Sequence, residues 1–127
     1  MKARVLSLPR GRSIALDGPA VVMGVINATP DSFYPHSRVA DVAAAIDAVA
    51  AMLTAGGAIV DVGGESTRPG SGYVGADEEA ARVVPVVEAI RSRWDAPISV
   101  DTRKASVARA AIDAGADMVN DVSALYD

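Results

Sequence analysis

The segment MGVINATPDSF, residues 23–33, changes abruptly from apolar to polar at Asn27. The apolar run, residues 21–26, is rich in β-branched side chains and predicts a strand that is buried on both faces. The polar residues begin where this strand leaves the core. A buried parallel strand that ends in amide, hydroxyl and carboxylate groups is typical of the edge at which α/β proteins place their active sites.

The same change follows three further apolar runs. Residues 59–62 precede the sequence GGESTR, residues 98–100 precede DTRK, and residues 118–119 precede an Asn-Asp pair. In a barrel or open sheet of parallel strands, the carboxyl ends share one edge. We therefore expect the polar side chains near these ends to converge. They are Asn27, Asp61, Asp101, Asn120 and Asp121.

Segments with helical periodicity separate the predicted strands. They are residues 41–53, 77–93 and 104–114. Asp41 and Asp77 are the expected N-caps of the first two helices, and glycines are expected to end the first and the last. Pro85 lies inside the second helix and predicts a kink or a restart there.

Alternation of strands and helices predicts a parallel α/β fold. Residues 1–127 are predicted to form a single domain, since no linker or shift in composition divides them. Residues 1–20 hold two short extended pieces around a Pro-Arg-Gly turn. This segment is either a hairpin that plugs the bottom of a barrel or a frayed tail.

Composition excludes several classes of protein. The chain has no cysteine, which excludes disulfides, thiolate nucleophiles and cysteine-bound zinc. Its single histidine, His36, excludes a multi-histidine metal site, and no serine has a histidine partner at a readable spacing. The net charge of −4 and the lack of a basic run argue against nucleic-acid binding. No apolar run is long enough to span a bilayer, and we expect a cytoplasmic protein.

Three motifs each allow two interpretations. The glycine-rich stretch 63–70 carries hydroxyls and a guanidinium that suit phosphate oxygens, or it is a solvated surface loop. Asp101 accepts paired N–H donors from an amino-heterocycle, or it caps the next helix. Asn120 matches the edge of a heterocyclic ring with one donor and one acceptor, or it belongs to a turn.

Together these motifs resemble the signature stretches of dihydropteroate synthase, the folate-pathway enzyme that sulfonamides inhibit. The matching stretches are residues 27–33, 61–70, 99–102 and 120–123. The resemblance implies an eight-stranded (β/α) barrel of the TIM type, of which this chain supplies the first four β/α units. It also implies the condensation of hydroxymethyl-dihydropterin diphosphate with 4-aminobenzoate to give dihydropteroate and diphosphate, with Mg²⁺ as cofactor, by a homodimer.

Carried over to matching positions, the resemblance assigns individual roles. Asp101 and Asn120 become catalytic residues that also contact the pterin, and Asn27 becomes the residue near Mg²⁺ and the diphosphate. The other assignments are Thr67 and Arg68 near the diphosphate and the aminobenzoate, and Phe33 and Pro69 as walls of the aminobenzoate pocket.

The chain departs from the family pattern in two ways. Residues 34–38 replace an acidic, glycine-rich stretch, which changes the expected fold of the first loop. The later strands of the family, which bring a further pterin-binding aspartate, a lysine and an arginine, have no counterpart here. We therefore expect a truncated half-barrel with open first and fourth strands that is inactive alone.

Two alternatives to the synthase are kept open. The first is a non-catalytic, truncated pterin-binding module. The second is a barrel of the methyltetrahydrofolate methyltransferase type, which shares the pterin-holding aspartate and asparagine but does not need the loops at residues 29–33 and 65–70.

Overall fold

A four-stranded parallel sheet is the centre of the molecule. The computed structural model describes residues 4–18, 20–28, 38–65 and 74–121. The sheet has the strand order β3-β4-β5-β6, and each neighbouring pair is parallel. In chain order the elements are β1 (Val5–Ser7), the short 3₁₀ helix η1 (Pro9–Gly11), β2 (Ser13–Ala15), β3 (Met23–Asn27), α1 (Arg38–Thr54), β4 (Ile59–Gly63), α2 (Ala76–Arg93), β5 (Ile98–Asp101), α3 (Ala105–Ala114) and β6 (Met118–Asn120).

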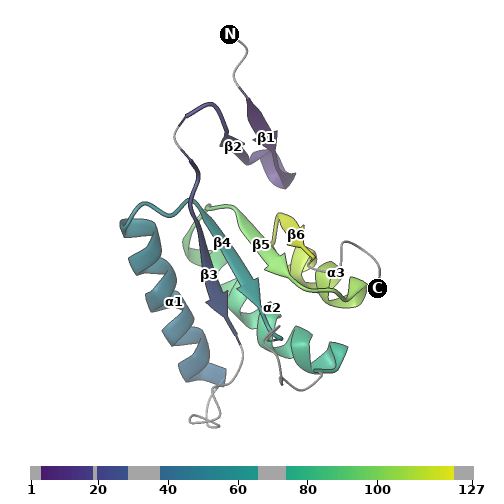
Figure 1. Ribbon diagram of the computed structural model, residues 1–127. Helices are drawn as coiled ribbons and strands as arrows, with labels where there is room; N and C mark the ends of the chain where they lie inside the picture. Colours follow the sequence, from purple (N-terminus) through teal and green to yellow (C-terminus); the bar gives the residue numbers. More distant parts are fainter. Residues whose placement is uncertain (1–3, 19, 29–37, 66–73, 122–127) are drawn as a thin grey trace.

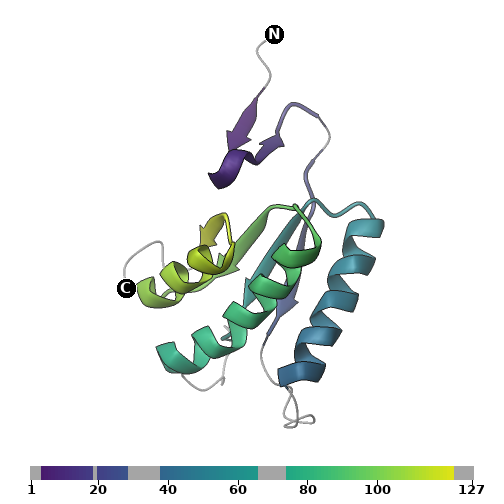
Figure 2. The ribbon, with the colours of Figure 1, turned by 180° about the vertical axis from the view of Figure 1, so that it is seen from behind.

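The described helices cover one face of this sheet. Figure 1 looks onto the opposite face, and Figure 2, seen from behind, shows α1, α2 and α3 side by side in front of the strands. Strand order that follows chain order, with one helix between successive strands, is the pattern of consecutive units of a (β/α) barrel. The predicted parallel α/β architecture is therefore confirmed.

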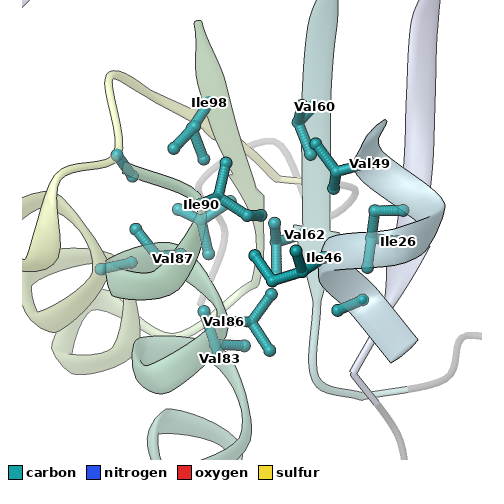
Figure 3. Packing of buried hydrophobic residues seen from close by; sticks show 14 residues of the cluster. Ile26, Ile46, Val49, Val60, Val62, Val83, Val86, Val87, Ile90 and Ile98 are labelled. Atoms are coloured by element: carbon teal, nitrogen blue, oxygen red, sulfur yellow. The ribbon is translucent and has the colours of Figure 1, made fainter. Parts of the chain in front are cut away.

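Apolar side chains between the sheet and the helices form the core. Val60 and Val62 of β4 are fully buried, and Figure 3 shows them facing side chains of α1 and α2. The labelled partners there are Ile46 and Val49 from α1, and Val83, Val86, Val87 and Ile90 from α2. Alternate strand residues point to opposite faces, so the burial of these valines places the intervening Asp61 on the other face.

Strand β3 departs from its prediction. It was expected to be buried on both faces, but only Ile26, which faces the helices, is buried. Met23 and Val25 alternate with it and are 42% and 61% exposed. The physical reason is that β3 is an edge strand, and no described element covers the second face of the sheet.

Several helix boundaries also differ from expectation. Helix α1 begins at Arg38, ahead of Asp41, and α2 has Gly75 as its N-cap, so that Asp77 lies in its first turn. Helix α2 continues through Pro85 without a restart. Carboxylates in the first turn still favour this helix through its dipole, although none caps it by a side-chain hydrogen bond.

The glycine ends of the helices are confirmed. After α1, Gly56 adopts φ 103° and the amide of Gly57 donates to the carbonyl of Met52 at 2.9 Å. Gly115 ends α3 at φ 127°, a value that favours glycine. A Cβ at position 115 would lie 2.9 Å from Cγ of Arg91, so close packing reinforces the requirement for glycine.

The N-terminal segment forms the predicted hairpin. Strands β1 and β2 pair antiparallel, and the hairpin lies beyond the amino ends of the parallel strands in Figure 1. It is tied there by Arg12, which donates from Nε to Oδ1 of the buried Asp117 at 2.8 Å. Oδ2 of Asp117 accepts from Arg91 at 2.7 Å and from the amide of Ile98 at 2.9 Å. Whether this hairpin plugs a closed barrel stays a prediction.

Candidate active site at the carboxyl edge of the sheet

The last residues of the four parallel strands lie in one row. Asn27 is the register partner of Gly63, Gly63 of Asp101, and Asp101 of Asn120. Neighbouring strands are about 4.8 Å apart, so this row places Asp101 beside Asn120 and about 10 Å from Asn27. The prediction that polar residues from distant parts of the chain share this edge is confirmed.

These residues also lie on a common face. Ile98 and Val100 of β5 are buried on the helix side. The alternate residues Ser99 and Asp101 therefore point to the face that no described helix covers. Asn120 is in register with Asp101 and lies on the same face. In a closed barrel this face is the interior, where active sites are built at the carboxyl ends.

Asp61 joins two of the strands through hydrogen bonds. Its side chain is almost completely buried, and it accepts a hydrogen bond from the hydroxyl of Ser99. Nδ2 of Asn120 lies 3.5 Å from Oδ1 and 3.4 Å from Oδ2 of the same carboxylate. These bonds connect β4 with β5 and reach across β5 to β6.

Asp101 lies in an acidic environment. Burial raises its pKa, and the negative charges of Asp61, Glu79 and Asp121 raise it further. The ionised form of such a carboxylate is stabilised when a ligand donates hydrogen bonds to it or brings a positive charge near it. This site is therefore suited to an electron-poor, N–H-rich ring and repels anions.

A second charged cluster lies beside this edge. Glu79 of α2 is 1% exposed, accepts from the hydroxyl of Thr102, and lies 2.7 Å from Nζ of Lys104. The same ammonium group donates to Glu65, which also accepts from Arg103 at 2.8 Å. The cluster joins the end of β4, the start of α2 and the segment after β5.

The charges of this cluster stabilise one another. Burial acts to raise the pKa of Glu65, but the hydrogen bonds and charge of Lys104, together with Arg103, outweigh burial and lower it. Burial acts to lower the pKa of Lys104, but its hydrogen bonds to Glu65 and Glu79 outweigh burial and raise it. Glu65 and Lys104 therefore stay charged around neutral pH.

The first residues of the loop after β4 are held closely. Gly64 is buried, and its carbonyl accepts from Nη1 of Arg82 at 3.0 Å. A Cβ at this position would lie 2.8 Å from Cγ2 of Val83 and 3.1 Å from the carbonyl oxygen of Glu79. Close packing against α2 therefore requires a glycine here.

The predicted site residues differ in what the structure says of them. It brings Asp101 and Asn120 together and places Asn27 exposed at the end of β3. Phe33, Thr67, Arg68 and Pro69 lie outside the described residues, as does His36.

Sequence reasoning missed the cluster of Glu65, Glu79 and Lys104. Its members come from three separate segments, and nothing in the sequence pairs them. Sequence reasoning also did not predict the hydrogen bond that Asp61 accepts from Ser99. A signal for that partner existed, because Asp61 and Ser99 are polar residues inside otherwise apolar strands, which marks both for the same face.

Among the described residues, no three or more His, Cys, Asp or Glu side chains are grouped to hold a metal ion. Within the same residues, none of the helices has the length and apolar character needed to cross a membrane.

Comparison with known proteins decides the family. The family model described as pterin binding enzyme matches residues 23–127. The chain belongs to the pterin-binding enzyme family.

Relatives within this family are dihydropteroate synthases. The chain is 51% identical over 113 residues to the dihydropteroate synthase of Streptococcus pyogenes serotype M1, a match that covers 88% of the chain and 42% of that relative. It is 54% identical over 111 residues to a probable bifunctional folylpolyglutamate synthase/dihydropteroate synthase of Haloferax volcanii, which covers 87% of the chain and 13% of that relative. The resemblance drawn from the motifs is confirmed.

Solved structures agree with these relatives. The 7,8-dihydropteroate synthase of Vibrio fischeri superposes with a TM-score of 0.86 at 44% identity, over 98% of this chain and 44% of that one. The dihydropteroate synthase of Xanthomonas albilineans, solved with 4-aminobenzoic acid, superposes with a TM-score of 0.83 at 45% identity, over 93% of this chain and 44% of that one. The four parallel strands and the three helices between them therefore correspond to part of a barrel, and the chain spans less than half the length of these relatives.

Proposed function

We propose that this chain provides the pterin-binding part of a dihydropteroate synthase. The reaction joins hydroxymethyl-dihydropterin diphosphate to 4-aminobenzoate and releases diphosphate. The observation that carries the proposal is the placement of Asp101 and Asn120 side by side, on one face, at the carboxyl edge of the sheet. Solved relatives support the substrate class, since one was solved in complex with pteroic acid and another with 4-aminobenzoic acid.

Asp101 and Asn120 bind the ring in this proposal. The carboxylate of Asp101 accepts the two N–H donors of the aminopyrimidine part of the pterin, and the amide of Asn120 meets the adjoining edge. During reaction the methylene C–O bond breaks, diphosphate leaves with the bonding electrons, and the arylamine nitrogen forms the new C–N bond and loses a proton. Positive charge that develops on the pterin is stabilised by Asp101.

Asn27 is the proposed protein ligand for Mg²⁺. Asn27 is exposed at the end of β3, and its side chain offers an amide oxygen, which suits an ion that keeps several waters and takes few protein ligands. When bound, Mg²⁺ neutralises the diphosphate leaving group. Thr67 and Arg68 are proposed to contact the diphosphate and the aminobenzoate.

Further proposals follow from the synthase assignment. Phe33 and Pro69 are proposed as walls of the aminobenzoate pocket. Sulfonamide binding is proposed for that pocket, since the dihydropteroate synthase of Yersinia pestis has been solved with a sulfonamide drug. We also propose a homodimer and a cytoplasmic location for the whole protein.

Calorimetric titration of 6-hydroxymethyl-7,8-dihydropterin tests the role of Asp101. Loss of charge-assisted hydrogen bonds costs about 1.5–3 kcal/mol, so Asp101→Asn should weaken binding about 10-fold or more. Asp113→Asn is the matched control, because Asp113 is exposed on α3 and should bind normally. Equal affinity in the two variants would contradict the assignment.

Turnover separates the synthase from the second candidate, a non-catalytic pterin-binding module. The uncovered face of the sheet, with Met23 and Val25 exposed, favours this second candidate for the chain by itself. Dihydropteroate formation from both substrates and Mg²⁺ would support the synthase. Dihydropterin binding without product would support the binding module.

A further inference from the structure

We propose that Glu79 is a positioning residue that fixes the backbone which carries Asp101 at the carboxyl end of β5. Its carboxylate holds the side chains of Thr102 and Lys104, which follow Asp101 in the chain. Glu79 then contributes to dihydropterin binding without touching the ligand. This inference rests on the proposed function, in which Asp101 accepts hydrogen bonds from the ligand.

Glu79 occupies a fixed place beside the sheet. It is 1% exposed and lies in the first turn of α2. Helix α2 packs closely against the end of β4 here, since a Cβ at Gly64 would lie 3.1 Å from the carbonyl oxygen of Glu79 and 3.2 Å from its Cγ. Close-packed elements of this kind shift little relative to one another. The side chain of Glu79 therefore starts from a well-defined position.

Two contacts tie the segment after β5 to this carboxylate. Oε2 of Glu79 accepts a hydrogen bond from the hydroxyl of the buried Thr102, and Oε1 lies 2.7 Å from Nζ of Lys104. The hydroxyl oxygen of Thr102 also accepts from the backbone amide of Lys104 at 3.1 Å. The two residues are therefore joined to each other as well as to Glu79.

Asp101 and Thr102 face opposite sides of the sheet. Thr102 reaches α2 on the helix side, and Asp101, its neighbour in the chain, points to the uncovered face. The backbone amide of Thr102 donates to the carbonyl of Asn120 at 3.1 Å. Asp101 is therefore followed directly by a residue that is held from two directions. A shift of Thr102 would displace the carboxylate of Asp101 with it.

Charge and stability do not account for a carboxylate at position 79. Burial and the charge of Asp61 raise the pKa of Asp101, and the charge of Glu79 raises it further. Glu79 thereby disfavours the ionised form of Asp101 that the proposed site needs. A buried ion pair is also weak evidence for stability, because apolar residues of similar volume often stabilise a protein as well. Positioning is the role that its contacts support.

Two variants with opposite changes of charge separate position from charge. We would titrate 6-hydroxymethyl-7,8-dihydropterin calorimetrically into Glu79→Gln, which removes a negative charge, and Lys104→Met, which removes a positive one. An effect through charge would shift the affinity in opposite directions. Loss of positioning should weaken binding in both variants. Because hydrogen bonds weaken steeply when they are poorly aligned, we expect a loss of about 3- to 10-fold in each.

The controls remove the same charges at exposed positions. Glu78→Gln changes the residue before Glu79, whose side chain is 62% exposed in its ion pair with Arg82. Arg109→Met changes an exposed arginine of α3. Both controls should bind the ligand like the unchanged chain. Opposite shifts in the Glu79 and Lys104 variants, or affinities equal to those of the controls, would overturn the inference.

A pair of substitutions at Thr102 covers the case in which Glu79→Gln does not fold. Thr102→Val has nearly the same shape but lacks the hydroxyl that donates to Glu79, and Thr102→Ser keeps this hydroxyl. The valine variant should bind dihydropterin about 3- to 10-fold more weakly, and the serine variant should keep most of the affinity. Equal affinities of the two variants would overturn the inference.

Stability is measured beside affinity, because a purely structural residue would affect both together. The double variant of Glu79→Met with Lys104→Met replaces the ion pair by apolar side chains. Its urea midpoint should stay close to that of the unchanged chain, while its affinity for dihydropterin should fall about 3- to 10-fold. Unchanged affinity in this double variant would overturn the inference.

Two further outcomes distinguish the inference from the proposed function. Losses of affinity that follow losses of stability in every variant would mean that Glu79 supports only the fold, and would overturn the inference alone. Absence of dihydropterin binding by the unchanged chain would overturn the proposed function and the inference with it.

Discussion

At the scale of single residues, the function proposed for Asp101 opposes its contribution to stability. Burial and the charges of Asp61, Glu79 and Asp121 raise its pKa in the folded chain. The folded state therefore holds this proton more tightly than the unfolded state. Stability then falls as pH rises from the ordinary value of 3.8 through the raised folded value. A ligand that donates hydrogen bonds to the carboxylate of Asp101 offsets this loss of stability.

Asp101→Asn should accordingly stabilise the ligand-free chain at pH 7. The amide removes a charge from an acidic environment, so the urea midpoint should rise. The advantage over the unchanged chain should shrink as pH falls toward 4. A variant that is less stable than the unchanged chain at pH 7 would show that Asp101 supports the fold.

Glu65 makes stability depend on pH in the opposite direction. Its pKa is lowered in the folded chain, mainly because hydrogen bonds and charge from Lys104 outweigh burial. It therefore contributes stability that is fully present above the ordinary value of 4.5 and is lost as pH falls through the folded value. Glu65→Gln should cost about 1–3 kcal/mol at pH 7 and should flatten the stability profile below pH 4.5.

Urea unfolding from pH 3 to 7 checks this prediction. Glu88→Gln is the control, since Glu88 is exposed on α2, and its profile should follow that of the unchanged chain. Identical acid profiles for the Glu65 and Glu88 variants would contradict the proposed role of the cluster around Lys104.

At the scale of elements, the two faces of the sheet differ in what they contribute. Val62 of β4 is fully buried against the helices, and Val25 of β3 is 61% exposed on the other face. Val62→Ala should cost about 2 kcal/mol, from lost burial and a cavity, and Val25→Ala less than about 0.5 kcal/mol. Chemical denaturation of the two variants provides the comparison. Similar losses would mean that the second face is covered in solution.

The order of elements was largely predictable from the sequence. Apolar runs that end in polar residues located all four parallel strands and the edge that they share, because the change from apolar to polar residues at the end of a strand is visible in the local sequence. Burial of β3 on both faces was not predicted correctly, since it depends on neighbours that local sequence does not contain. The start of α1 ahead of Asp41 was missed for a similar reason, since a capping signal is weak compared with tertiary packing.

The site was predictable in part. Asp101 and Asn120 were located because each ends a strand, and the parallel register of β5 and β6 then places them side by side. The contacts of Lys104 with Glu65 and Glu79 were not predictable. These side chains come from three separate segments, and only the folded core determines how those segments lie relative to one another.

At the scale of the whole molecule, two strand edges and an apolar face are left uncovered by the described residues. Strands β3 and β6 are the outer strands of the sheet. Val22, Met23 and Val25 near β3 are exposed, as is Val119 on β6. Open edges of this kind pair readily with other chains. The chain also spans only 42% of the Streptococcus pyogenes relative.

Concentration-dependent association is the consequence we expect for this chain by itself. Its apparent mass in size-exclusion chromatography should rise with concentration. Val25→Lys should reduce this association, because a charge on the exposed side of an edge strand blocks pairing. Lysine at an exposed helix position, Ala51→Lys, should leave it unchanged. A monomer at all concentrations would contradict the expectation.

Binding of dihydropterin at the carboxyl edge of the sheet is the central claim, and NMR mapping tests it most directly. Titration of 6-hydroxymethyl-7,8-dihydropterin into the ¹⁵N-labelled chain should shift the amide signals of Asp61, Asp101 and Asn120, including the side-chain amide of Asn120. Shifts confined instead to the apolar groove between α1 and α2, which Val42 and Ala89 help to line, would contradict the account.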